Sequence, residues 1–428
     1  MVARRRKTRT SWTRTTGKST NRTSSFEKPK GLRLRSEPFT FLTTLVWLAG
    51  FEAYVRGRTR LWSAAGLWAG VLLIGFDVYA AVVTYIPEYR VRNDFRLIYG
   101  AALTGLHDGY GHLYDLAAQK ASVEGLGPGF YWSPFLNPPP LAWVATPLTV
   151  LPFNIAIWVW TLLVLGALLL TWYLVAPGVT RLTRLAHLAL WLGVFPTAFG
   201  LLVGQPVALV AVAVAACWWL SERNRAVWAG IALAAIAVKP QVAILVPLCL
   251  LVTGRTRIFV AWLAATGVLA LLALAMLGPD GLTRYRDALA LASQWEPTRR
   301  YAMSGLIGLG PQLYALQAVI VAITVAAAWR VRKAGPGLPI AVGILGSLLF
   351  TPYVGFQDFA MLFVAGWLLL RSQASDWQMG ILFTGFILLE LVLVLPPVLV
   401  LITEMSLLLT FLSPLNDPPR VVEEGASA

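Results

Sequence analysis

Long apolar blocks, separated by short polar or basic segments, run through most of this 428-residue chain. Residues 153–176 and 258–277 are two such blocks. Blocks of about 20 residues match the roughly 30 Å hydrocarbon core of a bilayer. Backbone exposed to lipid must satisfy its own hydrogen bonds, so each block predicts a helix, and none shows the period-2 alternation of a membrane barrel. The pattern predicts an all-α, polytopic integral membrane protein with about 10–12 transmembrane helices.

Composition supports the same class. Hydrophobic residues make up 57% of the chain and charged residues only 13%, with a mean hydropathy of +0.68. A soluble protein of this size could not bury so much apolar surface behind so little charge. The two cysteines, Cys217 and Cys249, lie inside apolar blocks, and their spacing indicates neither a disulfide nor a metal site.

The net charge of +15 is concentrated at the N-terminus, where residues 1–36 hold twelve of the 35 Lys and Arg against the single acid Glu27. We expect a disordered, cytoplasmic tail that binds anionic lipid and no nucleic acid. Residues 37–60 are predicted to form an interfacial helix, 61–415 the transmembrane domain, and 416–428 a C-terminal tail.

Basic residues between later apolar blocks predict the topology, because cytoplasmic loops are enriched in Lys and Arg. These residues are Arg223, Arg225, Arg255, Arg257, Arg330, Arg332, Lys333 and Arg371. The intervening segments then turn on the outer side of the cell membrane. They are the long loops 87–136 and 278–309 and the turns around Gln205, Lys239 and Asp358.

Two segments are too short or too irregular for a simple crossing. Residues 226–238 span only roughly 20 Å as a helix, which predicts that Lys239 lies at membrane depth in a cavity lined by protein. The proline-rich segment 137–151 is either a partial or re-entrant helix, or it crosses fully and places Arg181 and Arg184 outside.

Five short motifs follow one another on the predicted outer side. They are Asp94-Phe95-Arg96 with Tyr99 and Leu113-Tyr114-Asp115, then Asn137-Pro138-Pro139-Pro140, Gly204-Gln205, Lys239-Pro240-Gln241, and Thr351-Pro352-Tyr353 leading to Asp358. In this order the motifs resemble those of glycosyltransferase family 87. Two positions depart from the family pattern: Val207 stands where members often carry Asn, and Gln357 where some carry His.

The resemblance implies a GT-C type bundle with its active site facing away from the cytoplasm. It also implies inverting transfer of a sugar, mannose or arabinofuranose, from a polyprenyl-phosphate donor to a glycolipid or glycan acceptor. Such a donor already has a good leaving group, so the enzyme needs one carboxylate as base and cations for the departing phosphate. We assign the base to Asp94, with Asp77 and Asp358 as the alternatives.

The remaining site residues follow from the same chemistry. For the donor phosphate we nominate Lys239, Arg96, Arg299 and Arg300, and for the sugar or acceptor Gln205, Tyr99, Gln241, Asp358 and Asp77. Lys239 has an alternative role as the permanent partner of Asp358. The arginines of 278–309 belong either to a mobile lid or to a solvated amphipathic helix.

No cofactor is expected, and no metal. His107 and His112 are five residues apart, whereas helical metal ligands are usually three or four apart, and no third ligand accompanies them. Two other functions stay open at this point: a lipid or solute transporter, which would also have broken helices, and a non-catalytic glycolipid-binding protein on the same fold.

Overall fold

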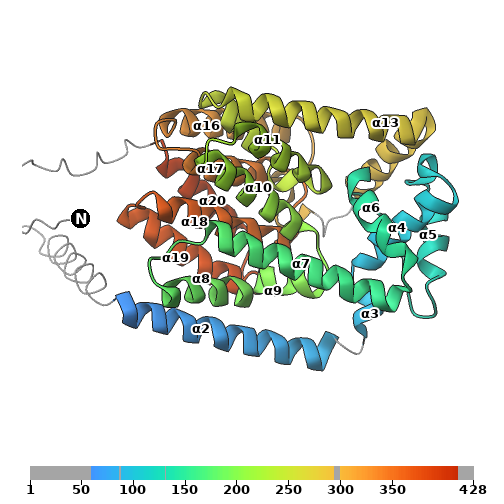
Figure 1. Cartoon of the computed structure of the whole chain (residues 1–428), viewed down its shortest axis with the longest axis horizontal. Helices are drawn as coiled ribbons and strands as arrows, with labels where there is room; N and C mark the ends of the chain where they lie inside the picture. Colours follow the sequence, from blue (N-terminus) through green and yellow to red (C-terminus); the bar gives the residue numbers. More distant parts are fainter. Residues whose placement is uncertain (1–58, 86–87, 131, 294–298, 413–428) are drawn as a thin grey trace, which may run out of the picture. The chain divides into compact units, whose positions relative to one another are not determined.

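The computed structural model describes residues 59–85, 88–130, 132–293 and 299–412 (Figure 1). Within these ranges the chain forms helices and no strand. The predicted all-helical class is therefore confirmed. The predicted basic tail 1–36, most of the predicted interfacial helix 37–60 and the C-terminal tail 416–428 lie outside the described residues.

Four helices in the described part are long and apolar enough to cross a membrane: α2 (Thr59–Ala80), α7 (Phe153–Val175), α13 (Thr256–Ser293) and α16 (Pro311–Arg330). A fifth candidate is the broken pair of α8 (Arg181–Gly193) and α9 (Phe195–Leu202), which meet at 64°. Several helices make the protein polytopic, as predicted. The count of about 10–12 crossings stays a prediction.

Shorter helices complete the bundle. They are α10 (Val207–Glu222), α11 (Ala226–Ala234), α12 (Val246–Val252), α17 (Gly337–Phe350), α18 (Met361–Arg371), α19 (Asp376–Glu390) and α20 (Val398–Thr410). Single turns of 3-10 helix interrupt them at η5 (Ala235–Val238), η6 (Pro240–Val242) and η7 (Phe356–Ala360). Because α11 is short, the chain turns back at Lys239 inside the protein, as its length predicted.

Small residues let the first helix approach the bundle closely. A Cβ on Gly70 of α2 would lie 2.4 Å from the backbone of Ala189 in α8, and one on Gly193 would lie 2.8 Å from the carbonyl oxygen of Gly70. Without a hydrophobic force between helices in lipid, such close backbone packing supplies much of the association energy. In contrast, most of the other side chains of α2 are exposed.

The predicted outer loop 87–136 is largely helical. It contains α3 (Tyr89–Arg92), α4 (Phe95–His107), η3 (Tyr110–His112) and α5 (Leu116–Glu124). The next segment forms only α6 (Pro139–Ala145) and η4 (Thr146–Val150). Together these two pieces reach about 20 Å, less than the hydrocarbon thickness, which favours the partial-helix interpretation of 137–151.

The predicted outer loop 278–309 is also mostly helical, because α13 continues through a kink to Ser293. At the kink Gly278 has a φ of 63°, a conformation that favours glycine, and Pro279 follows it. Beyond the kink, Tyr285 stacks on Tyr114 at 4.1 Å between ring centroids. Residues 279–293 are thus helical, and α15 (Met303–Ile307) follows; the choice between a mobile lid and a solvated amphipathic helix stays a prediction.

Residues of the predicted cytoplasmic loops gather at one end of the bundle. Arg371 donates hydrogen bonds to the carbonyl oxygens of Val175 and Ala176, at 2.6 and 3.0 Å, and its guanidinium lies over the ring of Trp218. Helix α10 starts directly after Gln205 and ends near this cluster. The turn at Gln205 therefore lies at the opposite end of the bundle.

Candidate active site

Four polar residues from four separate segments form one continuous chain of contacts. Gln205 donates from Nε2 to Oδ2 of Asp94 at 2.6 Å, and its Oε1 accepts a bond from Nζ of Lys239 at 2.9 Å. Lys239 also forms an ion pair with Oδ1 of Asp358. We call these four residues the polar chain. All four were nominated from the sequence, and the fold brings them together.

The backbone around Asp94 is fixed to the turn that carries Gln205. The amide of Asp94 donates to the carbonyl oxygen of Val203 at 2.8 Å, and Nδ2 of Asn93 donates to that of Leu202 at 2.9 Å. The side chain of Asn93 also accepts the amide of Phe95 at 2.9 Å, at the first turn of α4. Asp94 is thereby held beside Gln205.

Gly204 is required in this turn by its conformation and its surroundings. Its φ is 72°, and a Cβ there would lie 2.5 Å from Oδ1 of Asn93. Its carbonyl oxygen accepts a bond from Nε1 of the buried Trp160 at 2.8 Å. Asn93 and Trp160 were not nominated from the sequence. Asn93 could have been found from its position directly before Asp94, whereas no local sequence feature indicates Trp160.

Replacing Gly204 with Ala should lower activity strongly while most of the helical structure is kept. The left-handed conformation costs about 1–2 kcal/mol for a residue with a Cβ, and the clash pushes Asn93 and Gln205 apart. We expect a loss of transfer activity with unchanged circular dichroism. Gly75→Ala is the matched control, because a Cβ at Gly75 meets nothing within 4 Å; equal activity of the two variants would contradict this role.

The Lys239–Asp358 end of the polar chain is buried, with side-chain exposures of 6% and 2%. Lys239 lies at the break between η5 and η6, and Asp358 lies in η7, where its Oδ2 accepts the amide of Gly355 at 3.2 Å. The alternative in which Lys239 pairs with Asp358 is therefore the arrangement found. A direct contact between Lys239 and a donor phosphate stays a prediction.

Asp94 is the end of the polar chain that reaches the surface, with 38% of its side chain exposed. Even so, the surrounding protein desolvates the carboxylate and raises the pKa of Asp94 above its usual range. The charge of Arg96, the bond from Gln205 and the charge of Lys239 oppose this shift in part. A raised pKa makes a carboxylate a stronger base near neutral pH.

Arg96 is buried directly behind Asp94 and is committed to the local backbone. It is 1% exposed, and its Nη1 donates to the carbonyl oxygens of Arg92 and Asn93 at 3.0 and 2.9 Å. The same nitrogen lies 3.5 Å from Oδ1 of Asp94. In this position Arg96 stabilises the ionised form of Asp94 and the turn before α4. Its predicted contact with the donor phosphate stays a prediction.

The remaining nominated residues lie outside the polar chain. Tyr99 is buried, packs against Phe153 and donates its hydroxyl to the carbonyl oxygen of Leu151 at 2.8 Å, so that it serves the core of the bundle. Gln241 is partly buried in η6. Asp77 lies in α2, where one of its carboxylate oxygens is buried without a hydrogen bond. Among the described residues, no side-chain hydrogen bond or ion pair joins Tyr99, Gln241 or Asp77 to the polar chain.

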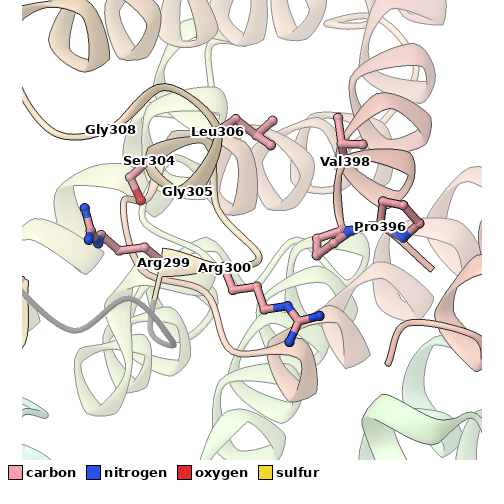
Figure 2. A pocket seen from close by; sticks show the side chains of 9 residues that line it. Arg299, Arg300, Ser304, Gly305, Leu306, Gly308, Pro396 and Val398 are labelled. Carbon is pink, nitrogen blue, oxygen red and sulfur yellow. The ribbon is translucent and has the colours of Figure 1, made fainter. Parts of the chain in front are cut away.

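Arg299 and Arg300 line a cavity of about 610 Å³ that includes no member of the polar chain (Figure 2). In the described part of the protein, no group of three or more His, Cys, Asp or Glu side chains is placed to bind a metal. His112 instead contacts Arg284, with 3.3 Å between Nδ1 and Nη1.

Comparison with known proteins yields one match. The family model of glycosyltransferase family 87 matches residues 135–352, which is half of the chain. Neither the curated proteins nor the solved structures give a match. The matched range contains Gln205 and Lys239, while Asp94 and Asp358 lie on either side of it.

Proposed function

This chain belongs to glycosyltransferase family 87 and is a membrane glycosyltransferase, and we propose that Asp94 is the general base of an inverting transfer. The donor in this proposal is a polyprenyl-phosphate sugar, with mannose favoured over arabinofuranose. The acceptor is a hydroxyl of a glycolipid or glycan on the outer side of the membrane. The observation that supports it most is the polar chain, whose exposed end is Asp94.

The reaction is a single displacement at the anomeric carbon. Asp94 takes the proton of the acceptor hydroxyl as that oxygen forms its bond to the anomeric carbon. The bond from this carbon to the phosphate oxygen breaks, and its electron pair leaves with the polyprenyl phosphate. Because the phosphate is a good leaving group, no general acid is needed, and one displacement inverts the anomeric configuration.

Gln205, Lys239 and Asp358 position the base. An ammonium group can only donate hydrogen bonds, so Lys239 requires the oxygen of the Gln205 amide to face it. The amide nitrogen of Gln205 must then face Asp94. Asp358 in turn holds Lys239. The position of Lys239 thus fixes the orientation of the Gln205 amide, and this amide holds one oxygen of Asp94. The Asp94 carboxylate keeps its access to solvent.

The outer orientation rests on charge. The basic loops gather at the end of the bundle opposite Gln205, and basic loops favour the cytoplasmic side. The polar chain then faces the side on which lipid-linked donors supply sugars. This placement is tested by whether a membrane-impermeant thiol label, applied to one side of sealed vesicles, reaches a cysteine introduced at Asp108, which is exposed and lies outside the polar chain.

Transfer by the purified, full-length protein tests the function itself. Radiolabelled mannose on a polyprenyl phosphate is offered with lipids extracted from the host membrane, in parallel with a polyprenyl-phosphate arabinofuranose and a nucleotide-linked mannose. We expect label in a lipid or glycan product from the polyprenyl-phosphate mannose only. Transfer from the nucleotide-linked mannose at an equal rate would contradict the polyprenyl-phosphate donor. Transfer of arabinofuranose alone would identify arabinofuranose, not mannose, as the transferred sugar.

The pH dependence of the rate should report Asp94. A base acts when deprotonated, so the rate falls as pH falls through the pKa of Asp94, which burial places above the usual value of about 3.9. Gln205→Leu removes a hydrogen bond that stabilises the ionised form, and should move this acidic limb to higher pH. Gln312→Leu, at an exposed glutamine bonded to the carbonyl oxygen of Ile307, should leave it unchanged. An acidic limb unmoved by Gln205→Leu would contradict the assignment.

A further inference from the structure

A cavity of about 610 Å³ opens between the loop around α15 and the start of α20 (Figure 2). Its volume falls within the range of about 300–1,000 Å³ that small-molecule sites occupy. The lining combines two arginines, small or polar loop residues and an apolar wall: Arg299, Arg300, Ser304, Gly305, Leu306, Gly308, Pro396, Pro397 and Val398.

The two arginines of this cavity have no carboxylate partner among the described residues. The Nε of Arg299 is buried and donates no hydrogen bond to a described residue, and Arg300 is exposed with its guanidinium 5.8 Å from the ring of Tyr301. Figure 2 shows the two guanidinium groups on different sides of the loop, with that of Arg300 directed to the side on which Pro396 lies. Arg300 is thus the cation that the cavity presents most openly.

These arginines differ from the other two cations nominated for the phosphate. Lys239 is paired with Asp358, and Arg96 is buried against backbone carbonyls and Asp94. Both therefore have their charge satisfied within the protein. Among the four, only Arg299 and Arg300 lie in the wall of this cavity and form no ion pair with a carboxylate of the described residues.

The rest of the lining indicates what the anion is attached to. Pro396 and Val398, around the start of α20, and Leu306, on the loop around α15, form the apolar part of the lining (Figure 2). A soluble anion such as inorganic phosphate makes no use of such a wall, whereas an anionic head on an apolar chain matches both parts of the lining.

The loop that lines the cavity contacts the segment that contains Asp358 of the polar chain. Ser304 donates its hydroxyl to the carbonyl oxygen of Pro352 at 2.5 Å. The ring of Tyr301 packs edge-on against Phe356 and Phe359, with centroids 5.6 and 6.4 Å away, and these two residues flank Asp358. The loop that carries Arg299 and Arg300 therefore packs against the segment 352–359, which also contains Asp358.

We propose that this cavity binds a phosphate group carried on a long apolar chain, with Arg300 and Arg299 as its cations and the start of α20 as its apolar wall. The inference rests on the proposed function in so far as the lipid is the donor's carrier. A bulk anionic phospholipid offers the same chemistry, and the experiment separates the two sources.

Binding is measured on the full-length protein in nanodiscs of phosphatidylcholine, with sugar-free, radiolabelled polyprenyl phosphate as the probe. Replacing both arginines, Arg299→Gln with Arg300→Gln, should raise the apparent Kd for the probe by about tenfold or more, as expected for the loss of charge-assisted bonds. Arg300→Lys alone should retain more affinity than Arg300→Gln. Arg286→Gln is the matched control, because Arg286 is exposed and forms an exposed ion pair with Asp287 away from the cavity lining.

Competition by phosphatidylglycerol or by inorganic phosphate identifies the occupant. If neither displaces the probe at equal concentration, the cavity serves the donor's carrier; if phosphatidylglycerol displaces it, the cavity serves anionic membrane lipid. Wild-type affinity in the double variant, with the thermal unfolding midpoint unchanged, would overturn the site, as would equal competition by inorganic phosphate. Asp94→Asn should bind the probe normally, so failure of the cavity and failure of the base are seen separately.

Discussion

Replacing Asp94 with Asn should lower kcat by about 100- to 10,000-fold, the usual contribution of a positioned base. The amide of Asn cannot take the proton of the acceptor hydroxyl at neutral pH. Its oxygen can still accept the bond that Gln205 now donates to Asp94, so the local fold is expected to persist. Affinity for the donor should stay near that of the wild type. Initial rates of label transfer at saturating donor measure the effect.

Glu124→Gln is the matched control for this substitution. Glu124 is an acid of the same outer segment, its side chain is 51% exposed, and its partner is the exposed Lys120. We expect wild-type rates in this variant. If Asp94→Asn retained a large part of the activity, the base would have to be Asp358 or Asp77. Asp358 would then have to leave its ion pair with Lys239, and Asp77 would have to act from α2.

The members of the polar chain could be predicted from the sequence because each lies in a short motif that resembles the family's. Asp94 lies in the predicted outer loop 87–136, and the other three lie at predicted turns. Their contacts could not, since the hydrogen bonds join residues 111, 34 and 119 positions apart. Charge patterning predicts that the turns lie on one side of the membrane, but which side chain bonds to which depends on where the short helices end. The ion pair of Lys239 with Asp358 is seen in the fold, and a direct contact of Lys239 with the donor phosphate stays a prediction.

Hydropathy predicts the apolar helices well and the polar ones poorly. Residues 279–293 contain enough charge to resemble a loop, yet Gly281, Ala288 and Ala292 are buried at spacings that place them on one face of a helix. In the same way, Phe95 and Tyr99 are four residues apart in α4, and both face the core. A sequence window averages over the two faces of such a helix, so it does not show that Tyr99 is buried; a contact of Tyr99 with sugar stays a prediction.

The burial of Arg96 depends on a contact that a linear motif does not contain. Arg96 follows the turn at Asn93 and Asp94, and its side chain folds back onto the carbonyl oxygens of that turn. From the sequence it was one more cation of an outer loop. The cavity wall at Pro396 and Val398 had no sequence signal either, because it is opposed to Arg300 only through the packing of α20.

Breaking the buried ion pair should have the second largest effect. Lys239→Met leaves the Asp358 carboxylate buried without its partner, which costs about 3–5 kcal/mol for pairs of this kind. Asp358→Asn should be similarly destabilising, because it leaves the ammonium group uncompensated. The double variant removes both charges, and its loss should be smaller than the sum of the two single losses by about 1–3 kcal/mol. Unfolding midpoints from tryptophan fluorescence in one detergent measure all four proteins.

The kinetics of these variants separate the two roles considered for Lys239. If Lys239 positions Gln205 and thereby Asp94, the variants that remain folded lose kcat while KM for the donor changes little. If Lys239 contacts the donor phosphate directly, Lys239→Met raises KM for the donor, and Asp358→Asn, which frees the ammonium group, should lower it. Because Lys239 is buried and bonded to both Gln205 and Asp358, we expect the loss in kcat. Additive losses of stability, together with a higher KM in Lys239→Met, would instead assign the phosphate to Lys239 and leave the Arg299–Arg300 cavity to another lipid.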